Sequence, residues 1–231
     1  EVLTFPAWDC MPYDRVSPSS SIMCQRMGAI SALIAGTDDS GRRLILTTVN
    51  AVIQRLPPKE SIISGNLKIS VGKKLKYSDL TEFLSNDGYS RTSSVREASE
   101  YAIRGGIIDV FPPSYDQPFR IDLFGERIET LRTFDPLSQI TTGHIDNIQL
   151  VPASEVRYDK ASINKFRGNY QSHFGALSSK DPIFSALSEG RRHIGAEHWL
   201  PLFYDRLTSL VELLPKSIII FAHGFDEDFN K

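Results

Sequence analysis

An alternation of apolar and charged residues runs from Tyr101 to Phe134 and constrains the fold more than any other feature of the sequence. Side chains on a β-strand point to opposite faces in turn, so such a strand can pack one face and present Arg, Asp and Glu on the other. Gly125 can adopt the positive φ of a tight hairpin between two of these runs. We therefore predict an antiparallel sheet with strands at 101–111, 119–124, 127–134 and 145–150.

The segments on either side of this sheet combine strands with helices. Before it, helical spacing of apolar residues predicts a helix over 22–35, with Ser20 or Ser21 as N-cap and Gly36 as C-cap. The run of β-branched residues and leucines at 43–49 predicts a buried strand of the parallel type. After the sheet, we predict helices over 160–174 and 181–189 and a buried strand over 217–222.

One α/β domain interrupted by an insertion explains this order of elements more simply than three independent folds. The expected parts are 1–65 for the first part of the α/β domain, 66–152 for an inserted α+β domain with an antiparallel sheet, and 153–231 for the second part. Because the sequence has no initiator methionine and begins within a strand-like run, we expect it to be a fragment of a longer protein.

The composition argues against several classes of protein. A formal net charge of -2 disfavours a chain that wholly wraps nucleic acid, although it is compatible with a local basic patch. Cys10 and Cys24 are too few for a disulfide framework, so we expect reduced thiols in a cytoplasmic protein. No apolar run approaches the ~20 residues of a membrane span, and we expect no membrane contact.

The motifs of common catalytic and metal sites are missing from the sequence. It lacks the GxxxxGK(S/T) loop that binds nucleotide phosphates, the HExxH pair that binds zinc and the GxSxG turn of hydrolases. The run 218–221, followed by Asp226 and Glu227, is similar to the strand and acid that hold Mg²⁺ in P-loop NTPases. Because these acids lie well past the strand, an acidic surface turn is favoured. We therefore predict no catalytic, cofactor-binding or metal-binding residues.

Arginines gather on and beside the predicted strands. Arg120 and Asp122 share one face of their strand, and alternation places Phe124 on that same polar face. An aromatic ring among arginines is the composition of a protein-binding hot spot. Cross-strand pairing with Asp or Glu on a solvated face explains the pattern equally well. Nucleic-acid binding is a third alternative, which the nearby acidic residues disfavour. The arginines are Arg104, Arg120, Arg127 and Arg132.

Several separate motifs, in the same order, resemble the UvrB-homology module of UvrB and of bacterial transcription-repair coupling factors. They are Trp8–Pro18, Val49–Leu56, Arg104–Pro112, Phe119–Phe124, Thr133–Pro136 and Glu197–Phe203. UvrB carries a tyrosine-rich hairpin that clamps damaged DNA, whereas the corresponding stretch here, 9–21, holds only Tyr13. The sequence therefore resembles the coupling factor family over nearly its whole length, with the N-terminal helicase-like region of UvrB as the alternative.

The resemblance implies a fold and a binding site. A helicase-like α/β domain of the P-loop NTPase type, degenerate at its nucleotide site, would be interrupted by a domain that binds UvrA. By motif position, Arg104, Arg120 and Phe124 would contact UvrA. The module itself would be non-catalytic and would hold no cofactor. Additional interface residues are expected at Asp122, Glu126 and Arg127.

The resemblance also implies a larger protein. Its C-terminal motor would use ATP and Mg²⁺ to push stalled RNA polymerase off damaged double-stranded DNA, and the module would then recruit UvrA for transcription-coupled nucleotide excision repair. In the resting protein the C-terminal region would mask the UvrA-binding surface. This hypothesis requires an exposed Phe124 ring, and guanidinium groups that neighbouring carboxylates do not occupy.

Overall fold

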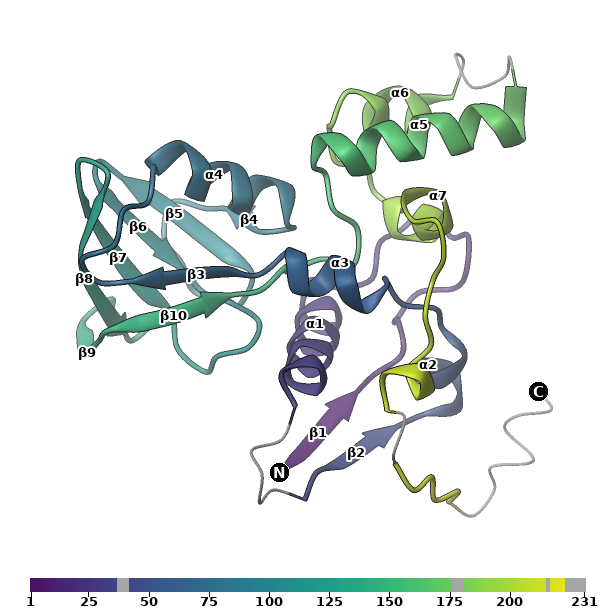
Figure 1. Cartoon of the computed structure of the whole chain (residues 1–231), viewed down its shortest axis with the longest axis horizontal. Helices are drawn as coiled ribbons and strands as arrows, with labels where there is room; N and C mark the ends of the chain where they lie inside the picture. Colours follow the sequence, from purple (N-terminus) through teal and green to yellow (C-terminus); the bar gives the residue numbers. More distant parts are fainter. Residues whose placement is uncertain (37–41, 176–180, 215–216, 223–231) are drawn as a thin grey trace.

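A six-stranded sheet dominates the computed structural model, which describes residues 1–36, 42–175, 181–214 and 217–222 (Figure 1). The order is β4-β5-β6-β7-β8-β9, and neighbours are antiparallel except for the parallel pair β4 and β5. The strands are β4 (Ser90–Arg91), β5 (Glu100–Arg104), β6 (Ile107–Val110), β7 (Phe119–Phe124), β8 (Arg127–Phe134) and β9 (Thr141–Ile145).

A second layer closes one face of this sheet. It consists of β3 (Leu67–Ser70), β10 (Asn147–Leu150) and helix α4 (Tyr77–Asn86). β3 and β10 form their own antiparallel pair, in which Leu67 lies opposite Leu150. Apolar side chains from the two layers form one buried core, which includes Ile69, Leu80, Leu84, Ile108, Ile121, Leu131 and Ile148. We call residues 67–150 the sheet unit.

The strands of the sheet unit differ from the prediction at two places. The predicted strand 101–111 is a hairpin, because Gly105 has a φ of 62° and turns the chain between β5 and β6. Gly106 follows at a close approach, where a Cβ would lie 2.8 Å from the Leu123 carbonyl oxygen. The predicted strand 145–150 is divided, because the chain bends at Asp146 and leaves β9 to pair with β3.

A two-stranded parallel sheet lies at the N-terminus. β1 (Val2–Phe5) pairs with β2 (Leu44–Thr47), and helix α1 (Ser20–Ala35) packs against β1. The parallel pairing of the strand predicted at 43–49 is confirmed. Its predicted burial is wrong: the side of β2 away from β1 has no strand partner among the described residues, and Leu46 is 51% exposed.

Helix α1 (Ser20–Ala35) begins at a different cap from the predicted one. Ser19, rather than Ser20 or Ser21, is the N-cap, and its hydroxyl accepts a hydrogen bond from the Ile22 amide. Gly36 is the C-cap, as predicted. Two short helices follow β2, and they are α2 (Val49–Ile53) and α3 (Lys59–Ser64).

The C-terminal segment is helical around an aromatic core. The two predicted helices are present as α5 (Lys160–Phe174) and α6 (Pro182–Ser188). Further short helices are η2 (Ala196–Trp199), α7 (Leu200–Phe203) and η3 (Val211–Leu213). Phe166 stacks on Phe203 at a centroid distance of 4.8 Å. The buried strand predicted at 217–222 is wrong, because these residues form no strand and Ile218 and Ile220 are exposed.

Two ion pairs, one buried and one partly buried, join segments that are distant in the sequence. Arg26 of α1 donates from Nε to a Glu155 carboxylate oxygen at 2.6 Å, and both side chains are fully buried. Arg157 donates from Nε to Asp87, the C-cap of α4, at 2.7 Å. The Asp87 carbonyl also accepts from the Ala153 amide at 2.7 Å. The Arg157–Asp87 pair therefore links the sheet unit to the rest of the chain, and the Arg26–Glu155 pair joins α1 to the segment that follows the unit.

The structure is a mixed α/β fold with antiparallel sheets, as predicted. The helicase-like character of the remaining α/β part and the boundaries at 65/66 and 152/153 stay predictions. In the part of the chain that the structure describes, none of the helices has the length and apolar character needed to cross a membrane.

Candidate protein-binding surface

Phe124 projects into solvent from one end of the six-stranded sheet. It is the last residue of β7, pairs with Arg127 across the β7–β8 hairpin, and is 80% exposed. The pairing register shifts between Asp122 and Leu123, and Gly125 has a φ of 61° in the turn that follows. The bulge and the turn place the ring beyond the buried part of the strand. The exposed ring that the hypothesis requires is therefore observed.

A second hairpin turn lies at the same end of the sheet. Gly105 and Gly106 connect β5 to β6, and the Leu123 amide donates to the Gly106 carbonyl at 3.0 Å. This bond brings the turn that follows Arg104 beside the end of β7. We call this end, with the turns at 105–106 and 125–126, the hairpin end. The end therefore brings Arg104 and Phe124 to the same part of the molecule.

The guanidinium groups of Arg104 and Arg120 are both occupied by one carboxylate. Asp109 of β6 is fully buried and lies opposite Arg120 in the sheet register. Arg120 donates from Nε and Nη2 to its two oxygens at 2.7 and 2.9 Å, and Arg104 donates from Nη2 to Oδ2. These hydrogen bonds to Asp109 are the main reason that the pKa of Arg120 is raised. The condition that these groups be free of carboxylates is therefore not met.

The two arginines differ in how much of the side chain reaches solvent. The side chain of Arg120 is 16% exposed, and its guanidinium lies 4.5 Å from the centre of the Phe134 ring. The side chain of Arg104 is 50% exposed. Arg120 therefore holds the sheet together, since it compensates a buried charge and stacks on a buried ring. Arg104 can both pair with Asp109 and reach a partner.

The additional predicted residues fall into two groups. Asp122 pairs with Arg132 across β7 and β8, within the sheet face. Glu126 and Arg127 lie at the hairpin end, where Arg127 donates from Nε to the Gly72 carbonyl at 3.0 Å. The structure thus brings Glu126 and Arg127, but not Asp122, to the tip of the β7–β8 hairpin.

Lys74 belongs to this surface and was missed from the sequence. It forms an isolated bridge with Arg127 and lines a hollow with Gly72, Glu126 and Arg127. The Leu75 amide donates to the Glu126 carbonyl at 2.8 Å, which ties the 72–75 turn to the hairpin. The run Gly72-Lys73-Lys74 was the available signal, but local spacing cannot show that it lies beside a hairpin more than fifty positions further along.

Within the described ranges, the contact between Cys10 and His198 does not form a nucleophilic site. Cys10 Sγ lies 4.0 Å from His198 Nε2, but the ring accepts from the Tyr13 amide at Nδ1 and lies 2.9 Å from the Val16 carbonyl at Nε2. These partners fix the proton on Nε2, so the ring cannot take one from the thiol there. Burial, followed by nearby acidic groups, raises the pKa of Cys10. The Cys10 thiol is therefore protonated near neutral pH.

No cluster of His, Cys, Asp and Glu with metal-binding geometry occurs among the described residues. His223, Asp226 and Glu227, which the sequence places after the run 218–221, lie outside the described residues. The predicted acidic surface turn therefore stays a prediction.

Comparison with known proteins points to one family. Residues 67–156 match the model of the UvrB interaction domain. The chain is 33% identical over 95% of its length to the transcription-repair-coupling factor of Haemophilus influenzae and 32% identical over 94% to that of Rickettsia bellii. It is 31% identical over 96% to that of Escherichia coli. In each case it spans 19% of the relative's length. The resemblance inferred from the motifs is confirmed.

Proposed function

We propose that the chain binds UvrA, because residues 67–156 match the UvrB interaction domain. The chain is also similar to a segment that makes up 19% of the length of a transcription-repair-coupling factor. Within a whole protein of that kind, it serves transcription-coupled nucleotide excision repair, by recruiting UvrA to damaged DNA where RNA polymerase has stalled. This work takes place in the bacterial cytoplasm. The chain contributes the docking step and no bond-breaking chemistry.

The exposed Phe124 ring is the observation that carries the proposal. A large aromatic side chain that is 80% exposed at a hairpin tip buries most of its area only when another molecule covers it. Arg104, Glu126 and Arg127 surround the tip with charged groups of both signs, which suits a polar rim around an apolar anchor. Phe124 is therefore the anchor, and Arg104 is the arginine most able to contact UvrA.

The pairing of the arginines supports a protein partner over DNA. Arg104 and Arg120 are bound to Asp109, and Arg132 is bound to Asp122. Binding to a phosphate backbone needs cations whose charge is not already balanced. This sheet face offers few of them, so UvrA is the partner that the charges favour.

The rest of the proposal concerns the parts outside the sheet unit. The α/β part around β1 and β2 is a degenerate helicase-like domain that binds no nucleotide. ATP and Mg²⁺ are used by a C-terminal motor of the whole protein, which acts on double-stranded DNA and RNA polymerase. The C-terminal region of that protein contacts the hairpin end and masks it until recruitment begins.

The test compares two exposed apolar residues at different places on the sheet unit. We expect Phe124→Ala to weaken binding of purified UvrA by at least the ~2 kcal/mol that defines a hot spot, about thirtyfold. Leu137→Ala is the matched control, because Leu137 is 83% exposed but lies in the turn between β8 and β9. Equal affinities of the parent chain and the Phe124 variant for UvrA would exclude this surface.

Arg120 needs a separate measurement, because it supplies two of the three arginine hydrogen bonds to the buried Asp109, whereas Arg104 supplies one. We expect Arg120→Ala to lower both UvrA affinity and thermal stability, and Arg104→Ala to lower affinity with little change in stability. Thermal unfolding of each variant separates a lost contact from a damaged sheet. A stable Arg104 variant with full UvrA affinity would remove Arg104 from the interface.

A further inference from the structure

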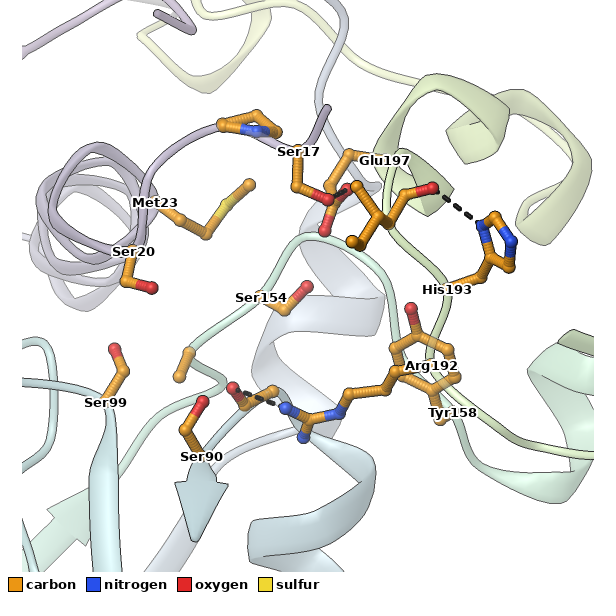
Figure 2. A pocket seen from close by; sticks show the side chains of 14 residues that line it. Ser17, Ser20, Met23, Ser90, Ser99, Ser154, Tyr158, Arg192, His193 and Glu197 are labelled. Carbon is orange, nitrogen blue, oxygen red and sulfur yellow. Dashed lines mark hydrogen bonds between the residues drawn. The ribbon is translucent and has the colours of Figure 1, made fainter. Parts of the chain in front are cut away.

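A pocket lined by both polar and apolar groups lies where the first turn of α1, the edge of the sheet unit and the 192–197 loop meet (Figure 2). Its volume is about 260 Å³. Ser99, which precedes β5, is at the opposite end of that strand from Arg104, so the pocket is separate from the hairpin end. Five serines contribute to its lining, and they are Ser17, Ser20, Ser90, Ser99 and Ser154.

Ser99 is the unusual residue of this pocket. It is 6% exposed, and its hydroxyl has no hydrogen-bond partner within the described residues. Its φ of 71° is rare for a residue with a side chain. Burial raises the pKa of the nearby Cys24 thiol, and the Ser99 hydroxyl partly offsets this rise. The geometry between the hydroxyl and the thiol does not meet that of a hydrogen bond. A buried hydroxyl normally has a partner, so this one indicates a ligand or water in the pocket.

The backbone around Ser99 is held firmly, so the hydroxyl cannot turn away at low cost. The Ser99 amide donates to the Phe111 carbonyl at 2.7 Å, and the Ser99 carbonyl accepts from the Ser90 amide at 2.8 Å. These bonds keep the residue at its positive φ and bring Ser90 beside it. Figure 2 shows the Ser90 and Ser99 side chains on the same side of the pocket, facing Ser20 of α1.

The first turn of α1 adds backbone donors to this side. The Ser19 hydroxyl and carbonyl accept from the amides of Ile22 and Met23. The amides of Ser20 and Ser21 have no partner among the described residues. The N-terminus of a sixteen-residue helix also carries a partial positive charge. Donors from the helix, from β4 and from Ser99 therefore converge on one space.

The charged groups of the pocket are arranged around these donors. Arg192 donates from Nη1 to the Gly88 carbonyl at 3.2 Å and from Nη2 to the Ser85 carbonyl at 2.7 Å, and no carboxylate pairs with it in the described structure. Glu197 accepts from the Ser17 hydroxyl at 2.6 Å. Figure 2 shows Glu197 beside Ser17, on the side of the pocket away from Ser90 and Ser99. Figure 2 shows the Arg192 side chain reaching toward Ser90, and Asp87 is the acidic group that interacts with its charge.

We propose that this pocket binds a phosphate group, with its oxygens at Ser20, Ser90 and Ser99. Hydroxyl and amide donors at a helix N-terminus, with an arginine nearby, suit an oxyanion with several acceptor oxygens. The volume is below the ~300–1,000 Å³ of pockets for drug-sized ligands, so the ligand is inorganic phosphate or a small phosphate monoester. The pocket joins α1, the sheet unit and the 192–197 loop, so a bound phosphate stabilises their arrangement.

The test uses the purified chain and measures thermal unfolding and calorimetric binding with inorganic phosphate. Glycerol phosphate is the second arm and distinguishes a monoester from the free ion, and chloride at equal ionic strength is the reference. We expect phosphate, or its monoester, to raise the unfolding temperature above the chloride reference. No phosphate-dependent rise and no heat of binding for either probe would overturn the proposal and leave a pocket filled by water.

Ser99→Gly separates binding from folding. Glycine tolerates a positive φ and carries no unpartnered hydroxyl, so without phosphate we expect this variant to unfold at a temperature no lower than the parent. We expect its phosphate affinity to fall about tenfold, the loss of one charge-assisted hydrogen bond. Ser90→Ala is a second variant that changes only an exposed hydroxyl, and we expect weaker binding there too.

Tyr13→Gly is the matched control, because Tyr13 also has a positive φ, 62°, but lies outside the pocket lining. We expect it to change stability without changing phosphate affinity. Phosphate affinities that are equal in the parent, the Ser99 variant and the Ser90 variant would overturn the assignment of the site. UvrA binding is measured in parallel, so failure of this proposal is distinguishable from failure of the hairpin-end proposal.

Discussion

The sheet unit and the β1–β2 region both bury β-strands, but only the first completes its layers. In the sheet unit, β3, β10 and α4 cover the six strands, and Ile121 is fully buried. In the β1–β2 region the described residues form a sheet of only two parallel strands, and Leu46 is half-exposed. Two-stranded sheets are marginal, and parallel strands are usually covered on both faces. A completed unit can hold a binding residue at a fixed place, and that is where the exposed Phe124 lies.

The largest expected effect tests this difference in packing directly. Ile121→Ala should destabilise the chain by about 2–5 kcal/mol, because it leaves a cavity in a closed core. Leu46→Ala removes a similar side chain from a half-exposed strand and should cost less than about 1 kcal/mol. Urea unfolding followed by circular dichroism measures both. Equal losses would show that the two regions share one core.

A pair of glycines sharpens the comparison between two parts of the sheet unit. Gly88 lies where the unit contacts Ala153 and Ser154 of the following segment, and Gly105 lies at the hairpin end. Gly88 has a φ of 97°, and a Cβ there would lie 2.4 Å from the Ser154 Cβ, whereas Gly105, at 62°, has open space. Gly88→Ala should cost about 2 kcal/mol or more, and Gly105→Ala about 1 kcal/mol from the strained φ alone. Thermal unfolding of the two variants gives the difference. A smaller loss of stability at Gly88 than at Gly105 would mean that the backbone around Gly88 and Ser154 can move apart at low cost.

The stability of the chain should also depend on pH, through Asp87 at its contact with Arg157. Burial is the main cause that raises the pKa of Asp87 to about 6 from 3.8, and Arg157 opposes it. The folded chain then binds more protons than the unfolded chain between these values. The stability that Asp87 contributes is therefore full below pH 3.8 and is lost as pH rises through about 6. The loss is on the order of 1–3 kcal/mol.

Urea unfolding at a series of pH values measures this loss, and Asp87→Asn should flatten the dependence between pH 4 and pH 7. Asp205→Asn is the control for removing a carboxylate at the surface, where Asp205 pairs with Lys165. A parent chain that gains stability as pH rises through 6 would contradict the assignment to Asp87.

The smallest change in stability is expected at Phe124, the residue proposed to anchor UvrA. Phe124→Ala should change the free energy of unfolding by less than about 0.5 kcal/mol, since the ring makes little contact with the core. Differential scanning fluorimetry of this variant and of Leu137→Ala checks the value. A large loss of stability would mean that the ring packs against the sheet in solution.

The sequence predicted the parts of the fold that follow local rules. The strands at 119–124 and 127–134 and the turn at Gly125 follow from alternation and from glycine chemistry. The split of the run 101–111 was not predicted, because a Gly-Gly pair is compatible with a strand until its partner is known. The predicted burial at 43–49 and 217–222 failed for a related reason, since an apolar run is buried only where other elements cover it.

The candidate site shows the same limit. Alternation placed Phe124 on the polar face, and it is exposed. The two arginines also lie where the pattern placed them, but it could not show that one buried carboxylate, Asp109, binds both. Lys74 and the serine pocket depend on contacts between distant segments, which no local spacing encodes.

The pairing of β3 with β10 has a consequence for how such a protein can change. Because Leu67 and Leu150 are opposite each other, a short linker could replace everything between them without pulling the surrounding chain apart. The sheet unit therefore leaves and rejoins the rest of the chain at neighbouring positions, and the bonds from Arg157 and Ala153 to Asp87 add a second connection.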